Sequence, residues 1–184
     1  PAPVAYRGMI LADPLPKPNF TLEDTSGERF DFRKETEGYI TLLYFGYTNC
    51  PDVCPTHMAN LAAGLEDAPE DVRERVKVVF VSVDPERDTL DRLRTWLDIF
   101  DESFIGLRGD IAEIDAIQQE ALGPFAFTIE RQELEGGGYA VSHSALVFAY
   151  TTDGEAHLAY PSGVYKEDWT NDLTQLVKKG WIEP

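Results

Sequence analysis

The stretch YITLLYFGYTNCPDVCPTHM, residues 39–58, joins an apolar run to a pair of cysteines. Its first half is a nearly continuous series of β-branched, aliphatic and aromatic residues, which is typical of a strand buried on both faces of a sheet. A helix is predicted after the cysteines, from about Cys54 to Asp67. A buried strand that leads into a helix is the beginning of an α/β unit.

A second apolar run, VKVVFVSVD at residues 76–84, follows this helix. Because the helical segment between the two runs is long enough to cross over, the two strands are predicted to pair in parallel. Upstream, residues 18–32 predict two short strands joined by a turn that contains Ser26 and Gly27.

The remaining elements complete a familiar order. The sequence predicts a helix at residues 88–100, a helix beginning near Asp110 and Glu113, a hairpin of residues 143–150 and 155–160, and a last helix at residues 166–179. This order describes an α/β protein with a thioredoxin-like fold, in which a central mixed β-sheet is flanked by helices and preceded by an N-terminal β-hairpin. The three glycines at residues 136–138 predict either a mobile flap or an exposed hairpin turn.

Length and composition predict one domain. A chain of 184 residues, 43% of them hydrophobic, can bury one substantial core, so we expect a single domain over residues 1–184 with residues 1–17 as an N-terminal extension. No apolar run approaches the roughly 20 residues of a membrane-spanning helix, so we expect the chain as given to be soluble. Because it begins with Pro1, we expect a mature or trimmed product, from which an N-terminal targeting or anchoring segment could have been removed.

The charge of the chain restricts its partners. Sixteen Lys and Arg residues against 33 Asp and Glu residues give a formal net charge of −17 and a pI near 4.4. The electrostatic field of this negative charge repels nucleic acid phosphates and anionic membranes, so neither is an expected partner. Most of this charge is expected to be a solvated face that keeps the protein soluble, with attraction to a basic partner as the alternative.

Cys50 and Cys54 are the only cysteines, and both are expected at one edge of the sheet. Amides at a helix N-terminus stabilise thiolates there. Residues four apart in a helix have Cβ atoms about 5 to 6 Å apart, wider than the ~3.8 Å typical of a disulfide, but the loop at Cys50 and Pro51 can close that gap. The pair can therefore form a disulfide when oxidised and a two-sulfur metal ligand when reduced.

Other roles for the pair fit less well. A static disulfide across so small a loop removes little entropy from the unfolded chain. Zinc usually takes four nitrogen or sulfur ligands, whereas the chain has two Cys and three His; two thiolates with one imidazole suit Cu(I) better. A thiol peroxidase of the peroxiredoxin type would have Thr three residues before the attacking Cys, but Thr48 lies two before Cys50.

Three blocks of the sequence resemble the signature blocks of the Sco (SenC) family, copper-handling proteins that assist assembly of the CuA centre of cytochrome c oxidase. They are YFGYTNCPDVCPTHM (residues 44–58), VVFVSVDPERDT (78–89) and VSHSALVFAYTTDGE (141–155), and the resemblance covers about residues 8–177. It implies a thioredoxin-like fold and a copper site made by Cys50, Cys54 and His143. The expected cargo is copper, as Cu(I) and in a second state as Cu(II).

The resemblance also implies partners and a location. The expected partner is the CuA-bearing subunit of cytochrome c oxidase, with other copper chaperones or thiol reductants as further partners. The expected location is the periplasm or the outer face of the cytoplasmic membrane, with the full-length protein anchored to that membrane. The sequence departs from the family pattern at Ser142, where many members carry Asp directly before the liganding His.

Two functions of different classes follow from the same two sulfurs. As a metallochaperone, the protein would hold copper with Cys50, Cys54 and His143 and pass it on by ligand exchange. As a thiol-disulfide reductase, Cys50 and Cys54 would be the catalytic residues that reduce the copper-site cysteines of the oxidase subunit. His143 discriminates between them, because metal binding should depend on it and disulfide exchange should not.

Other residues near these motifs have expected structural roles. We expect His57 to be a solvated helix residue, His157 to face solvent or pack in the hairpin, and Met58 to fill the core. Asp88 is expected to cap the helix at residues 88–100, and Tyr47 to be a core residue that shields the site.

Overall fold

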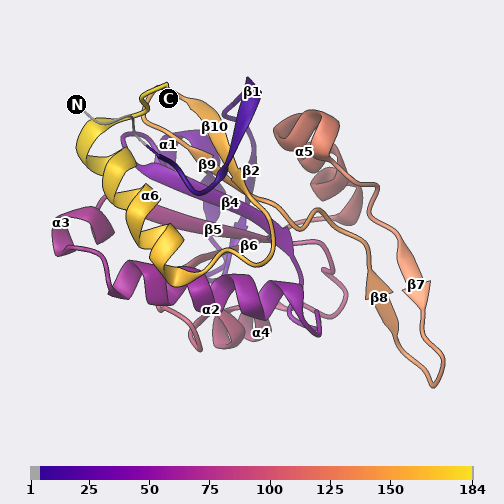
Figure 1. Cartoon of the computed structure of the whole chain (residues 1–184). Coiled ribbons are helices and arrows are strands. Elements are labelled where there is room, and N and C mark those ends of the chain that lie inside the picture. Colours follow the sequence, from indigo (N-terminus) through magenta and orange to yellow (C-terminus); the bar gives the residue numbers. More distant parts are fainter. Residues whose placement is uncertain (1–4, 184) are drawn as a thin grey trace.

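The computed structural model describes residues 5–183. Its main sheet contains β1 (Met9–Pro16), β2 (Thr21–Asp24), β3 (Arg29–Asp31), β4 (Ile40–Gly46), β5 (Val76–Ser82), β6 (Ile105–Arg108), β9 (Val147–Tyr150) and β10 (Glu155–Tyr160). The strand order is β1-β10-β9-β4-β5-β6-β2-β3 (Figure 1). Pairing is parallel for β4 with β5 and β5 with β6, and antiparallel elsewhere in this sheet. The predicted mixed sheet of an α/β, thioredoxin-like fold is confirmed.

The two apolar runs form the centre of the sheet. Every residue of β4 is buried, and β5 lies beside it in parallel, with Leu42 opposite Val78. A strand covered on both faces has no polar side, which explains why neither run alternates. The crossover between them contains α2 (Val53–Glu66), as the sequence predicted.

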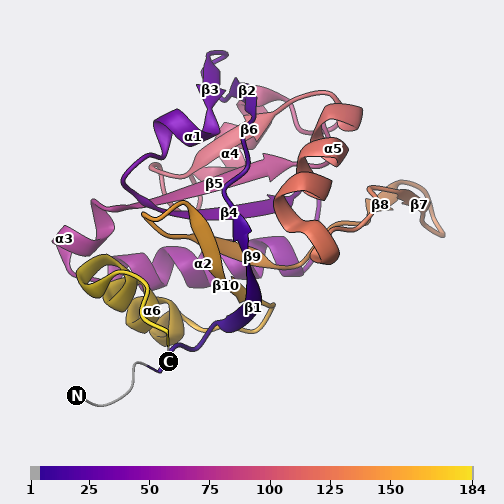
Figure 2. The same ribbon diagram turned by 90° about the horizontal axis from the view of Figure 1, so that it is seen from above.

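Helices cover both faces of the sheet (Figures 1 and 2). The others are α1 (Phe32–Glu35), α3 (Glu70–Arg73), α4 (Leu90–Leu97), α5 (Ile111–Leu122) and α6 (Lys166–Lys179), with a 3₁₀ turn at Gly123–Phe125. α2, α4 and α6 lie on one face, whereas α1 and α5 lie on the other. α2 packs closely on α6, because a Cβ atom at Gly64 would lie 2.6 Å from Cβ of Trp169.

The structure differs from the sequence-based expectations at the N-terminus and before β9. Residues 1–17, expected as an extension, contribute β1, which pairs with β10 at the sheet edge. The strand predicted at residues 143–150 begins only at Val147, so residues 143–146 form an irregular segment.

The triple glycine lies in an exposed hairpin turn. Among the strands of residues 5–183, β7 (Arg131–Glu133) and β8 (Tyr139–Val141) pair only with each other, and they extend away from the body of the protein (Figure 1). Gly136, Gly137 and Gly138 all have positive φ angles, a conformation that glycine adopts without steric cost. The three glycines therefore lie in the hairpin turn that was one of the two alternatives, and the mobile flap stays a prediction.

No helix within residues 5–183 combines the length and the apolar composition needed to cross a membrane.

Candidate metal centre

The cysteines lie where β4 ends and α2 begins. The amide of Cys50 donates to the carbonyl of Tyr47 at 3.2 Å, which closes the loop after the strand. Cys54 is in the first turn of α2, and its amide donates to Cys50 Sγ at 3.5 Å. Both sulfurs are free thiols, Cys50 9% exposed and Cys54 fully buried.

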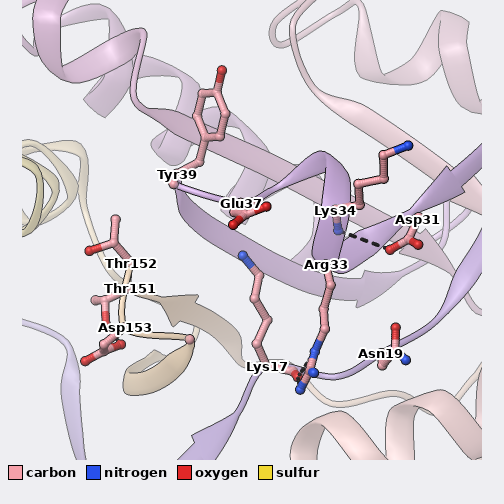
Figure 3. Close-up of a pocket in the computed structure, with 12 residues that line it drawn as sticks. Lys17, Asn19, Asp31, Arg33, Lys34, Glu37, Tyr39, Thr151, Thr152 and Asp153 are labelled. Carbon is pink, nitrogen blue, oxygen red and sulfur yellow. Dashed lines mark hydrogen bonds between the residues drawn. The ribbon is translucent and has the colours of Figure 1, made fainter.

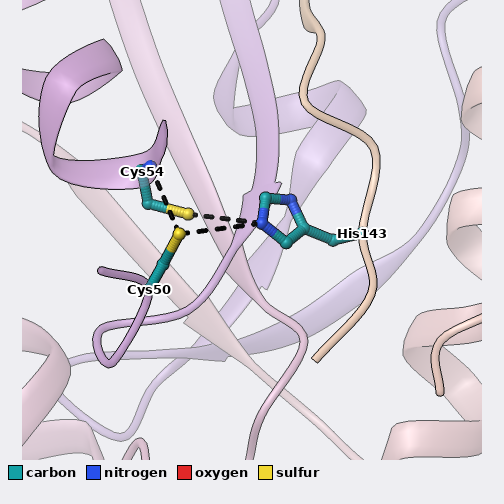
Figure 4. A group of neighbouring side chains, drawn as sticks. All are labelled: Cys50, Cys54 and His143. Carbon is teal, nitrogen blue, oxygen red and sulfur yellow. Dashed lines mark hydrogen bonds between the residues drawn. The ribbon is translucent and has the colours of Figure 1, made fainter. Parts of the chain in front are cut away.

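His143 reaches the cysteines because of the sheet topology. β9 runs antiparallel to β4, with Phe148 opposite Leu43, so the chain that enters β9 lies beside the chain that leaves β4. His143 Nε2 is 3.6 Å from Cys54 Sγ and 4.0 Å from Cys50 Sγ (Figure 4). The three potential ligand atoms lie within 4.8 Å of one another. The structure thus brings together the three residues predicted to hold copper.

The other ring nitrogen of His143 fixes its tautomer. Nδ1 lies 2.9 Å from the carbonyl oxygen of Ser144, and because a carbonyl only accepts, Nδ1 carries the proton. Nε2 is therefore the ring nitrogen that faces the two sulfurs, and in the neutral ring it holds the lone pair that a metal needs. Metal-ligating histidines usually have this arrangement, in which the remote N–H donates to a carbonyl or carboxylate. Two sulfurs and one such nitrogen suit a soft cation such as Cu(I).

The pKa values of the two cysteines are shifted in opposite directions. The hydrogen bond from the Cys54 thiol, helped by His143 and the Cys54 amide against the effect of burial, lowers the pKa of Cys50 to about 3. Burial raises the pKa of Cys54, and the neighbouring Cys50 sulfur raises it further. Without a metal, the reduced pair therefore holds one thiolate, on Cys50, and one thiol.

Two residues of β4 form the wall behind Cys54, and sequence reasoning missed both. The Tyr44 hydroxyl is 3.4 Å from Cys54 Sγ and donates to it. A Cβ atom at Gly46 would lie 2.8 Å from the same sulfur, so a larger residue there would displace it. The sequence signal that could have found them is the geometry of a strand, in which successive side chains point to opposite faces. Tyr44 and Gly46 are two residues apart and therefore share the face that α2 covers.

The sequence profile of SCO1/SenC matches residues 12–178. The chain belongs to the SCO1/SenC family. It is 35% identical to the mitochondrial protein SCO1 homolog 1 of Arabidopsis thaliana over 129 residues, which are 70% of this chain but only 37% of that relative.

Solved Sco structures share the fold over most of the chain. A solution structure of apo Sco1 from Thermus thermophilus is 33% identical with a TM-score of 0.80, covering 96% of this chain and 99% of that one. The structure of Bradyrhizobium japonicum ScoI with copper bound is 32% identical with a TM-score of 0.75, covering 88% and 98%. The resemblance to the Sco family that the sequence suggested is confirmed.

His57 does not have the solvated position expected from the sequence. It is buried, and its Nε2 donates to the carbonyl of Ala145 at 2.9 Å. Burial lowers the pKa of His57, which favours the neutral ring. The expectation was wrong because the irregular segment after His143 leaves a carbonyl that needs a donor from α2. Met58, by contrast, is fully buried as predicted.

Asp88 does not cap α4. Thr89 is the N-cap, and its hydroxyl accepts from the amide of Arg92 at 3.2 Å. The buried Asp88 carboxylate instead accepts from the amide and hydroxyl of Thr48, at 3.0 and 2.6 Å, and from the Ser82 hydroxyl at 2.7 Å. The expectation was wrong because Asp88 bonds to the loop that carries Cys50, a partner 40 residues away.

Ser142, at the position where many family members carry Asp, has a structural role here. Its hydroxyl donates to the carbonyl of Thr128 and accepts from the amide of Glu130, each at 2.8 Å. It therefore ties the base of the β7–β8 hairpin to the segment before β7. Tyr47 is buried, and its ring meets His143 edge-on with 5.6 Å between centroids, which agrees with the predicted shielding role.

Two other features, His157 and a surface hollow, lie away from this centre. His157 is buried as a packing residue, with its ring stacked on Trp181 at 4.5 Å and its Nε2 2.8 Å from Asp153 Oδ2. A surface hollow lined by Lys17, Arg33 and neighbouring residues lies beside the start of β4, at the opposite end of this strand (Figure 3). The Lys17 amine donates to protein acceptors there, the carbonyl of Thr36 and the hydroxyl of Thr41.

Proposed function

We propose that this protein is a copper metallochaperone that binds copper through Cys50, Cys54 and His143 and assists assembly of the CuA centre of cytochrome c oxidase. One observation carries the proposal: Cys50 Sγ, Cys54 Sγ and His143 Nε2 converge within 4.8 Å of one another. Membership of the SCO1/SenC family and the copper-bound B. japonicum relative support copper as the cargo.

The arrangement suits transfer as well as binding. Cys54 is fully buried behind Tyr44, whereas Cys50 and His143 retain contact with solvent. An incoming thiolate of an acceptor would therefore meet copper on the Cys50 and His143 side. Ligands would be exchanged one at a time, with Cys54 the last to release the ion. Binding requires Cys54 to lose its proton, so copper loading releases a proton at neutral pH.

Family membership also supports a proposal for the acceptor and the location. We infer that the acceptor is the CuA-bearing subunit of cytochrome c oxidase, and that the protein acts on the outer side of the membrane in which that oxidase resides. The similarity of the three sequence blocks to the Sco family supports both inferences.

Anaerobic titration with Cu(I) against a competing chelator tests the proposal. The fully reduced parent should bind one Cu(I) per chain, and His143→Ala should lower the affinity at least about tenfold, because losing even an outer-shell partner of a ligand costs that much. Cys50→Ala and Cys54→Ala should each lower it further, because each removes a thiolate. A His143→Ala protein that binds as tightly as the parent would contradict the three-ligand site.

A thiol-disulfide reductase is the second candidate. It is favoured by the difference in exposure and in pKa between Cys50 and Cys54. Cys50 is the more exposed and, with its lowered pKa, the thiolate. It would attack one sulfur of a substrate disulfide, breaking that S–S bond and releasing one substrate thiolate. Cys54, after losing its proton, would then attack Cys50 Sγ and release the second thiolate. Two electrons pass to the substrate, and Cys50 and Cys54 end as a disulfide.

The same variants separate the two functions. Reduction of a peptide that carries an oxidised pair of copper-site cysteines should require Cys50 and Cys54 but tolerate His143→Ala. Weak copper binding in the parent, together with full peptide reduction, would make the reductase the main activity.

A further inference from the structure

His143 lies on a segment that the main sheet does not hold. The His143 arm, residues 139–146, consists of β8 and the irregular chain before β9. Among the described strands, β8 pairs only with β7, and ladder pairing with the main sheet resumes at Val147. Backbone without ladder bonds opens locally at low free energy. The position of His143 must therefore depend on side-chain contacts between the arm and the body.

Arg87 makes several of these contacts with β8. Its guanidinium pairs with the buried Asp84, its Nη1 donates to the carbonyl of Tyr139 at 2.9 Å, and its Cζ lies 3.7 Å from the centroid of the Tyr139 ring. The Tyr139 hydroxyl closes the cycle by donating to Asp84 Oδ1 at 2.8 Å. Tyr139 is thus bound through its backbone, its ring and its hydroxyl, four residues before His143.

The same guanidinium also contacts the cysteine side of the centre. Arg87 Cζ is 5.7 Å from the centroid of the Tyr47 ring. Tyr47 accepts the Cys50 amide through its carbonyl and meets the His143 ring edge-on. Arg87 therefore lies between the loop that carries Cys50 and the arm that carries His143.

A second ion pair attaches the other strand of the hairpin to the same turn. Arg131 of β7 lies 2.6 Å from Glu86, and its guanidinium is also over the Tyr139 ring, at 4.6 Å. Glu86 and Arg131 are both substantially exposed, so this pair contributes little. Arg87, bound to a carboxylate that is 1% exposed, is the stronger attachment.

We propose that Arg87 is a positioning residue for copper binding, which holds the His143 arm against the loop that carries Cys50. This inference rests on the proposed copper site. It requires arginine rather than lysine, because a planar fork can pair with Asp84, donate to a carbonyl and stack on an aromatic ring together, whereas an ammonium is a single point charge.

A double-mutant cycle with His143 tests this role. Cu(I) affinity is measured by anaerobic competition in the parent, Arg87→Met, His143→Ala and the double variant. Arg87→Met should lower the affinity about 10- to 100-fold, as loss of a group that supports a metal ligand does. In the His143→Ala background it should change the affinity by no more than about twofold, which is within the scatter of such cycles and means that the loss acts through His143. Arg87→Lys, which keeps the charge, should share most of the loss.

Arg94→Met is the matched control. Arg94 is 29% exposed against 23% for Arg87, pairs with Asp98 at 2.7 Å and donates to the Phe104 carbonyl at 2.7 Å, but it lies on α4 and contacts neither half of the centre. It should lower the melting temperature and leave Cu(I) affinity unchanged in both backgrounds.

Amide hydrogen exchange in the metal-free protein gives a readout without copper. Arg87→Met should speed exchange of the hairpin amides, including Ser142, whereas Arg94→Met should not. Unchanged exchange in Arg87→Met would overturn the proposal, and so would an equal loss of affinity with and without His143. A parent that binds no copper would instead refute the proposed function, and hydrogen exchange would still decide whether Arg87 holds the arm.

Discussion

Gly46→Ala should weaken copper binding from inside the core. An added Cβ would lie 2.8 Å from Cys54 Sγ and 2.9 Å from Phe80 Cε2. These distances are 0.6 and 0.5 Å short of 3.4 Å, the shortest ordinary contact, so the sulfur, the ring or the strand must move. Neither neighbour has free space, because Cys54 and Phe80 are both fully buried.

The size of the effect follows from overpacking. Adding a methyl group to a filled core costs about 1 to 3 kcal/mol of folding stability. In a protein of this length each kcal/mol lowers the melting temperature by about 2 to 4 °C, so we expect a decrease of about 2 to 12 °C. Because a ligand must be held within about 0.5 Å of its working position, Cu(I) affinity should also fall, by about tenfold or more.

Gly106→Ala is the control for this prediction. Its Cβ would lie 2.7 Å from Leu97 Cδ1 and 2.9 Å from Leu93 Cγ, an equal crowding on β6 against α4 rather than against the cysteines. Thermal unfolding and anaerobic Cu(I) competition are measured for both variants. Both variants should have a lower melting temperature than the parent, but only Gly46→Ala should bind copper less tightly. Equal copper affinity in the two variants would refute the reasoning about the Cys54 wall.

Three further predictions concern the neighbours of the sulfurs. Tyr44→Phe removes the hydroxyl that donates to Cys54 Sγ. Because a hydrogen bond to a charged group contributes about 1.5 to 3 kcal/mol, Cu(I) affinity should fall about 10- to 100-fold in competition titrations. An unchanged affinity would contradict this prediction. In the reduced metal-free protein, Cys50 has a pKa lowered to about 3 and is a thiolate above that pH, so iodoacetamide should label Cys50 at pH 5 and labelling should be lost only as the pH falls through about 3. Cys54, whose pKa is raised, should stay unlabelled. Peptide mass mapping measures the labelling of both cysteines. Labelling of Cys50 that disappears below about pH 8, as for an ordinary thiol, would contradict a lowered pKa at Cys50. His57→Ala leaves the Ala145 carbonyl without its donor, which should lower the free energy of unfolding by about 1 to 3 kcal/mol in denaturant titrations. His57→Gln, whose amide can donate, should recover part of this loss. Equal stability of His57→Ala and the parent would show that the hydrogen bond contributes nothing.

The elements that were predictable from the sequence are those with a strong local pattern. β4 and β5 are apolar throughout because both of their faces are covered, and α6 has the predicted bounds, Lys166–Lys179. β6 was missed because it has only four residues, too few to show a period, and no hairpin turn of the kind that marks β2 and β3 joins it to a neighbouring strand. Short strands are defined by their partners rather than by their own sequence.

The site was predictable only in part, for the same reason. The spacing of Cys50 and Cys54 indicated a metal or redox pair, but His143 was connected to them through the family resemblance, not through any local pattern. Their proximity depends on the antiparallel pairing of β4 with β9. The roles of Asp88 and His57 were mispredicted because their hydrogen-bond partners lie 40 and 88 residues away.

X-ray absorption at the copper edge of the Cu(I)-loaded protein tests the central claim most directly. The parent should show two sulfur ligands and one nitrogen ligand, and His143→Ala should keep both sulfurs and lose the nitrogen. A parent with a single sulfur ligand, or a His143→Ala protein that retains the nitrogen, would contradict a copper site formed by Cys50, Cys54 and His143.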